Sequence, residues 1–205
     1  YELQKAADTL IRDIFKVKKG ETVVLTCDSL SCMNVVNAVA SSVHAVDALP
    51  MIIKFPAPDG VGQAADPKLP VEPLTGAVSN CDVWIEFNQK WLLYSTPYQR
   101  AITTNKKLRY MCLVEYTEDV MVRTMTGVDT EKLTAFMNRV AELNRAAKRI
   151  RMTTPGGTDV SFETDDRHVV SVDAGDASKS GVYMMMGQLN VVPKYGSVNG
   201  TIVFD

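Results

Sequence analysis

The sequence predicts a doubly wound α/β domain followed by the start of a second, strand-rich α+β domain. Short β-branched runs alternate with helical segments from Thr22 to Val114, and the apolar period changes to two near residue 149. Strand-helix-strand units cross over right-handed and bury both sheet faces, so the alternation indicates a mostly parallel sheet. We therefore expect residues 1–148 to form the first domain and residues 149–205 to begin a truncated second one.

The elements of the first domain each have a local signal. Apolar residues at helical spacing predict a first helix over 1–15, which Gly20 follows as a stop signal. Later β-branched and aromatic runs predict strands, and amphipathic segments between them predict helices. The expected strands are 22–26, 51–55, 83–87 and 110–114, and the expected helices are 35–43, 71–78 and 97–104.

The second domain begins with a change of pattern. A long helix is expected after Asp129, which can cap it. Residues 149–153 then alternate between polar and apolar side chains, Pro155-Gly156-Gly157 forms a turn, and residues 160–163 resume an extended segment. These features predict an antiparallel pair of strands. The chain stops directly after the apolar run 201–204 and starts inside a helical pattern, so both ends are expected to be cut.

Composition excludes two classes of partner. The net charge of −2 and the pI of about 5.8 provide no basic field for a nucleic acid. No apolar run approaches the ~20 residues that a membrane span requires. The four cysteines form no CxxC pair, which is typical of reduced thiols, and we expect a cytoplasmic protein.

Several motifs that would define chemistry are absent from the sequence. It contains no GxGxxG or GxxxxGK[ST] turn for phosphates and no GxSxG elbow for a serine nucleophile. The only histidines are His44 and His168, neither of them in an HExxH pair, so the chain alone is expected to hold no metal. Nucleotide-binding and α/β-hydrolase functions are therefore disfavoured.

Three apolar side chains are candidates for substrate binding. Trp91 and Tyr94 follow the third expected strand, and ligands of open α/β sheets bind beyond the carboxyl ends of the strands. An interdomain or subunit contact explains this aromatic cluster equally well. Met185 belongs to a run of three methionines that suits an adaptable substrate wall, although buried strand packing is the more common use of such a run.

Three segments carry a family signal: 17–25 (VKKGETVVL), 153–160 (TTPGGTDV) and 187–203 (GQLNVVPKYGSVNGTIV). They resemble, in order and spacing, the aminopeptidase T/aminopeptidase S family of metallo-aminopeptidases. In that family the second segment is a Pro-(Ala/Gly)-Gly-Thr-Asp-Leu turn. The third contains Gly-Glu-Val-Phe-x-x-Pro followed by Ser-x-Asn-Gly-x-Ile. The resemblance spans essentially the whole chain.

The resemblance implies the N-terminal portion of a metal-dependent hydrolase that releases N-terminal amino acids from peptides. It also implies a divalent metal, zinc, cobalt or iron, in the parent protein, a peptide or small-molecule substrate, and a homodimer. Gln188 stands where the family has a metal-ligating glutamate, and a neutral amide is a poor ligand for a divalent cation. The remaining ligands belong to the family's C-terminal part, so the chain by itself is expected to be inactive.

Two alternatives follow from the same departure. Iron-dependent ring-cleaving dihydroxypyridine dioxygenases are similar through a Ser-x-x-Gly-Thr strand and also lack the glutamate, and a single iron with open positions suits dioxygen chemistry. A metal-free degenerate member that acts as a binding module is the third possibility. The sequence leaves all three open.

Overall fold

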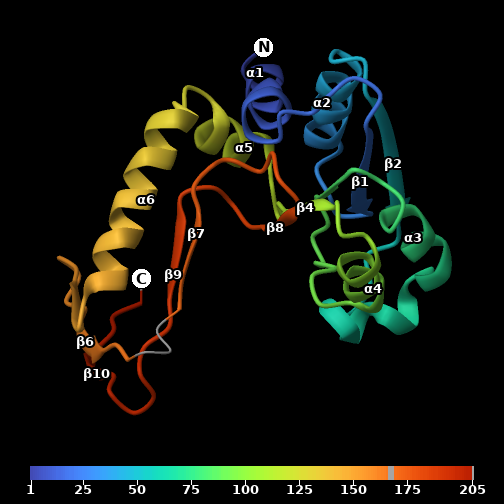
Figure 1. The fold of residues 1–205 in the computed structure, drawn as a ribbon. Helices are drawn as coiled ribbons and strands as arrows, with labels where there is room; N and C mark the ends of the chain where they lie inside the picture. The colour runs from blue at the N-terminus through green and yellow to red at the C-terminus, as the bar shows by residue number, and fades with distance from the viewer. Residues whose placement is uncertain (166–168, 205) are drawn as a thin grey trace. The chain divides into compact units, whose positions relative to one another are not determined.

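The computed structural model describes residues 1–165 and 169–204, and it divides into two compact units (Figure 1). The first unit contains Tyr1–Thr130 and Gly175–Met185, and the second contains Glu131–Ala174 and Met186–Asp205. The division differs from the expected boundary at residue 148, because the long helix falls in the second unit and a later strand returns to the first. His168 lies outside the described residues.

The described part of the first unit contains a five-stranded parallel sheet in the order β2-β1-β3-β4-β8. This sheet confirms the predicted fold class. Four strands match expected ones, whereas β8 joins the edge of the sheet from a segment that we had assigned to the second domain. The strands are β1 (Thr22–Asp28), β2 (Leu49–Phe55), β3 (Val83–Glu86), β4 (Arg109–Cys112) and β8 (Gly181–Tyr183).

Helices cover both faces of this sheet (Figure 1). On one face α1 packs against α2 and α5, and on the other α3 packs against α4. Thr117 caps the helix α5, because its side chain accepts a hydrogen bond from the Val120 amide, and this helix is not among the expected ones. The elements are α1 (Glu2–Asp8), α2 (Met33–His44), the 3-10 helix η2 (Gly62–Lys68), α3 (Val71–Val78), α4 (Thr96–Thr104) and α5 (Glu118–Met125).

The first helix differs from the regular α-helix that its spacing predicts. After Asp8 it continues as the π-helical segment η1 (Thr9–Ile14), in which the Phe15 amide bonds to the Leu10 carbonyl five residues back. The wider turn keeps Leu10, Ile14 and Phe15 fully buried together. The segment thus replaces the hydrogen bonds of a regular α-helix with wider ones and buries these three side chains.

The register of the central strands decides which side chains meet. Residues opposite one another in parallel strands point to the same face, and Val24, Trp84 and Tyr110 form one such row. This row lies in the apolar core beneath α3 and α4. The next row toward the carboxyl ends contains Thr26, Glu86 and Cys112, so a carboxylate enters the interior on the same face.

The second unit is strand-rich and antiparallel in its described part. The helix α6 (Thr130–Ala146) precedes a three-stranded antiparallel sheet, β10-β6-β5, and β7 pairs antiparallel with β9. The pairing of β5 with β6 confirms the antiparallel arrangement expected around the turn at 155–157. The strands are β5 (Arg149–Thr153), β6 (Asp159–Glu163), β7 (Val170–Asp173), β9 (Gln188–Val191) and β10 (Asn199–Thr201).

Gly200 allows β10 to approach β6 closely. Its φ of +131° lies in a region that side chains rarely adopt, and a Cβ there would stand 2.1 Å from the Asp159 carbonyl oxygen. Gly200 lies opposite Val160 in the pairing of these strands. The glycine of the Ser-x-Asn-Gly segment is therefore required by backbone geometry.

Replacement of Gly200 by alanine should separate β10 from β6, because neither the new Cβ nor the backbone carbonyl can move away without breaking the pairing. We expect Gly200→Ala to lower the free energy of unfolding by about 2–4 kcal/mol. Urea denaturation and faster amide hydrogen exchange in β6 and β10 would measure the effect. Gly76→Ala in α3, where a Cβ meets nothing within 4 Å, is the control and should stabilise the chain by about 0.5–1 kcal/mol.

Candidate functional site

The carboxyl ends of β1 and β3 form the topological switch point of the sheet. From β1 the chain connects to β2 on one side, and β3 and β4 follow on the other. Ligands of doubly wound sheets bind in the crevice at this point, because the loops that leave the two strands diverge there. Asp28 ends β1 and Glu86 ends β3, and both side chains are fully buried. Two carboxylates therefore lie at the position where this fold ordinarily places its chemistry.

Glu86 is held by two donors from different parts of the chain. The Tyr110 hydroxyl donates to one carboxylate oxygen, and the backbone amide of Leu92 donates to the other. Tyr110 reaches Glu86 from the neighbouring strand, and its ring packs against Trp84 with centroids 4.6 Å apart. The Trp84 indole in turn donates to the Thr26 hydroxyl at 2.9 Å. The carboxylate is thus enclosed by aromatic side chains and fully hydrogen-bonded.

Burial changes the proton affinities of this cluster. Desolvation raises the pKa of Glu86 to about 7, although the bonds from Tyr110 and Leu92 oppose the shift. Burial and the neighbouring Glu86 carboxylate raise the pKa of Tyr110, and burial raises the pKa of Cys112 to about 12. Tyr110 therefore remains a donor near neutral pH, and Cys112 remains a thiol that is unsuited to nucleophilic attack.

Asp28 and Glu86 together anchor the loop that follows β3. Asp28 accepts hydrogen bonds from the Leu30 amide at 2.9 Å and from the Lys90 amide at 2.9 Å. Glu86 accepts from Leu92, two residues farther along the same loop. On the outer side, the Trp91 carbonyl accepts from the Gly62 amide at 2.9 Å. The buried carboxylates therefore fix the loop at the switch point.

Asn88 is an exception in this hydrogen-bonded interior. Its side chain is fully buried, and neither amide atom has a hydrogen-bond partner among the described residues. Most buried polar side chains are paired, so an unpaired amide beneath a loop is unusual. Asn88 adds a free donor and a free acceptor to the two carboxylates at the switch point.

The aromatic residues that the sequence singled out divide into two groups. Trp84 and Leu92 are fully buried and belong to the core. Trp91 is 39% exposed and Tyr94 is 63% exposed, so the loop presents both on its outer surface. The Tyr94 ring meets the edge of Tyr98 with centroids 5.9 Å apart. The substrate-binding role of Trp91 and Tyr94 stays a prediction.

The other two candidates lie elsewhere in the chain. Met185 follows β8 and is 42% exposed. Gln188 begins β9 in the second unit, opposite Asp173, and its side-chain amide donates to the Asn190 side-chain oxygen at 2.9 Å. The described residues thus bring Trp91 and Tyr94 together on one loop, while Gln188 belongs to a different unit.

The side chains of the described residues do not fit the metal that the resemblance implies. Among the described residues, no group of three or more His, Cys, Asp or Glu side chains is arranged to hold a metal ion. Asp28 and Glu86 come closest in chemistry, but both already accept hydrogen bonds from backbone amides. The described part of the chain also contains no helix long and apolar enough to cross a membrane.

The polar cluster is not among the predicted sites, although the sequence contains one signal of it. Glu86 interrupts the apolar run Val83 to Phe87, and a carboxylate inside a buried strand needs compensating donors. The identity of those donors was hidden, since Tyr110 lies 24 residues away and meets Glu86 only through the register of β3 and β4.

The raised pKa of Glu86 makes stability depend on pH in a defined window. Between pH 4.5, which is the ordinary pKa of a glutamate, and about pH 7, Glu86 is protonated in the folded chain and ionised in the unfolded chain. The protonated carboxyl thus favours folding below pH 4.5, and this contribution, about 3 kcal/mol, is lost as the pH rises to about 7. We expect Glu86→Gln to abolish this fall in stability, because glutamine stays neutral throughout the range. The midpoints of urea denaturation, measured from pH 4.5 to 7, would show it. Glu72→Gln, at an exposed carboxylate, is the control, and equal pH profiles for Glu86→Gln and the unchanged chain would contradict the assignment.

Solved structures with this fold include two that are similar to this chain. The structure of 2,5-dihydroxypyridine dioxygenase from Pseudomonas putida KT2440 matches with a TM-score of 0.71 and 18% identity, covering 98% of this chain and 58% of that one. Wild-type AmpT from Thermus thermophilus matches with a TM-score of 0.62 and 15% identity, covering 97% of this chain and 63% of that one. At these identities the similarity concerns the fold, and the chain spans about three fifths of either relative. A comparison with curated proteins finds no match.

The family is shown by a sequence comparison. The model of the 2,5-dihydroxypyridine 5,6-dioxygenase family, NicX, matches residues 9–205. Membership of the aminopeptidase family, which the motifs had favoured, is not confirmed, and the match to AmpT supports a shared architecture. The match spans both units and nearly the whole sequence, so this chain belongs to the 2,5-dihydroxypyridine 5,6-dioxygenase family.

Proposed function

We propose that this chain is the N-terminal portion of an iron-dependent dioxygenase that opens the ring of 2,5-dihydroxypyridine or a closely related hydroxylated pyridine. The observation that carries the proposal is the family match over residues 9–205. It favours the dioxygenase over the aminopeptidase that the sequence motifs suggested. It also favours the dioxygenase over a metal-free binding module, because the matching family is one of enzymes.

The chemistry of Gln188 supports the same choice. A metal pair of the aminopeptidase type uses a carboxylate at this position, and the amide here is neutral and donates a hydrogen bond to Asn190. A single iron with open positions for substrate and dioxygen needs no carboxylate at this point. The iron ligands would come from outside the described residues, and we assign no reaction step to the residues described here.

The loop after β3 supplies the proposed contact for a planar substrate. Trp91 and Tyr94 are exposed on a loop whose backbone is fixed by Asp28, Glu86 and Gly62. Aromatic side chains on a fixed backbone can stack on a flat heterocycle at little entropic cost, worth roughly 0.5–1.5 kcal/mol for each ring beyond the buried area. We therefore retain Trp91 and Tyr94, with Met185, as proposed substrate contacts.

The proposal is tested with the full-length protein that contains this chain, loaded with ferrous iron without oxygen. Addition of 2,5-dihydroxypyridine and air should consume one dioxygen for each ring opened, because a dioxygenase places both oxygen atoms in the product. An oxygen electrode and the loss of the ring's ultraviolet absorbance measure the two quantities. Mass spectrometry after reaction under ¹⁸O₂ should find two labelled atoms.

Leucyl-p-nitroanilide, incubated with the same protein and with zinc or cobalt, is the matched control for the aminopeptidase alternative. Release of p-nitroaniline without oxygen uptake on 2,5-dihydroxypyridine would reject the dioxygenase. Absence of both activities would favour the metal-free binding module.

The role of Gln188 gives a separate expectation for the full-length protein. Gln188→Glu should raise the affinity for a second divalent ion, because a carboxylate adds the negative charge and the oxygen ligand that a metal pair requires. Calorimetric titration with cobalt would measure this affinity, and Gln188→Asn, which stays neutral, is the control. Equal affinities in the two variants would show that Gln188 does not occupy the position of the aminopeptidase glutamate.

A further inference from the structure

Two adjoining cavities lie at the amino-terminal edge of the parallel sheet, at the opposite ends of β3 and β4 from Glu86 and Cys112. The first has a volume of about 190 Å³ and the second about 300 Å³. Lys106 and Ser180 line both, so the cavities share a wall. All lining residues belong to the first unit.

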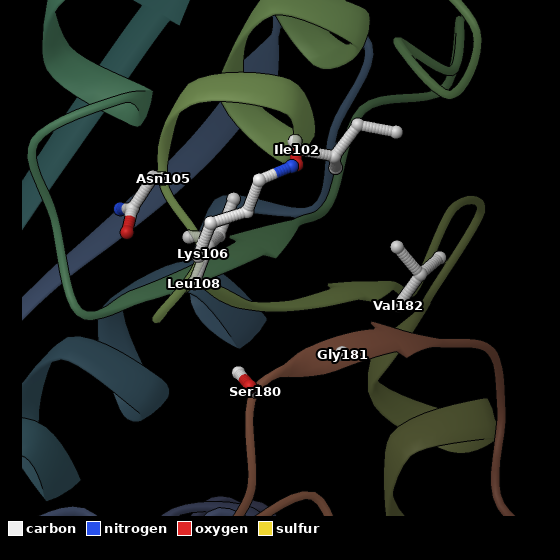
Figure 2. Close-up of a pocket in the computed structure, with 7 residues that line it drawn as sticks. All are labelled: Ile102, Asn105, Lys106, Leu108, Ser180, Gly181 and Val182. Carbon is white, nitrogen blue, oxygen red and sulfur yellow. The ribbon is translucent and has the colours of Figure 1, made fainter.

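The smaller cavity combines three apolar side chains with Asn105, Lys106 and Ser180. Ile102 comes from α4, Leu108 precedes β4, and Val182 lies on the edge strand β8. Figure 2 shows Ile102 and Lys106 on the α4 side of this cavity and Val182 on the opposite side, with Ser180 at the start of β8. The Gly181 amide bonds to the Leu108 carbonyl at 3.0 Å, which holds the two walls together. This arrangement suits a flat or compact apolar group.

The larger cavity is basic. Four cationic side chains line it, against the two carboxylates of Glu21 and Asp82. The charges of Glu21 and the buried Arg109 offset each other at 2.7 Å, and Asp82 accepts a hydrogen bond from the Thr22 amide at 2.8 Å, so the three lysines outnumber the one remaining carboxylate. The cationic residues are Lys18, Lys106, Lys107 and Arg109.

The lysines of this cavity remain available to a ligand. The ammonium groups of Lys18 and Lys107 have no hydrogen bond or ion pair with any described residue. Lys106 donates only to the Ile102 carbonyl, at 3.4 Å. The side chain of Ser180 is exposed and likewise has no partner among the described residues. A chain with a net charge of −2 thus gathers unpaired positive charge at one concave place.

We propose that the two cavities form one site for a small amphiphilic carboxylate, whose apolar body occupies the smaller cavity and whose anionic group faces the lysines of the larger one. The shared wall of Lys106 and Ser180 marks the boundary between body and carboxylate. A few polar groups beside an apolar wall are the usual composition of a small-molecule site. The proposal does not depend on the function proposed for the parent protein.

Benzoate is a suitable probe, and its binding can be followed by the amide resonances of residues 180–182 in the full-length protein that contains this chain. Benzoate should produce saturable shifts, and benzyl alcohol and acetate, which lack the charge or the ring, should bind at least about tenfold more weakly. Because the ion pairs are exposed, an increase from 0.05 to 0.5 M salt should weaken benzoate binding several-fold.

Variants distinguish binding in the two cavities from nonspecific attraction to surface lysines. Lys107→Ala and Lys18→Ala should each weaken benzoate binding about three- to tenfold, and Ser180→Asp should abolish it by placing a negative charge on the shared wall. Lys68→Ala, at an exposed lysine outside both cavities, should change nothing. Inorganic phosphate that binds as tightly as benzoate, or benzoate binding that survives Ser180→Asp, would overturn the proposal.

Discussion

The hydrogen bond between Tyr110 and Glu86 is the interaction on which the centre of the first unit depends. A carboxylate in a closed apolar interior destabilises a fold strongly unless donors surround it. One donor comes from the neighbouring strand and the other from the loop at Leu92. A slip of one residue between β3 and β4 would turn Glu86 and Tyr110 to opposite faces and remove this compensation. The buried charge therefore couples the strand register to the loop conformation.

The same anchoring makes the two edges of the parallel sheet different. At the carboxyl edge, Asp28 and Glu86 draw the loop after β3 into the crevice that such folds usually leave for a ligand. The loop consequently presents Trp91 and Tyr94 outward. At the amino edge the connections leave concave space lined by lysines and apolar side chains. These two cavities thus lie at the amino edge, opposite to the carboxyl edge at which ligands of α/β sheets usually bind.

The motifs that suggested an aminopeptidase have a physical explanation in the backbone. Three of their glycines, Gly157, Gly187 and Gly200, have φ values of +105°, +83° and +131°, which side chains rarely adopt. Glycine is favoured at such turns by backbone geometry alone, so these positions do not by themselves indicate a reaction. Gln188, where the resemblance implies a metal-ligating glutamate, has a neutral side chain that donates a hydrogen bond to Asn190.

Local pattern in the sequence determined the fold class and most elements of the first sheet. Apolar alternation and β-branched runs act over a few residues, so they predicted β1 to β4 and the antiparallel pair β5 and β6. They could not predict that β8, three residues long, pairs with β4 and returns the chain to the first unit. The meetings of Glu86 with Tyr110 and of Lys106 with Ser180 were likewise decided by tertiary structure. Strand pairing joins residues distant in sequence, and the period of a segment contains no information about its partner.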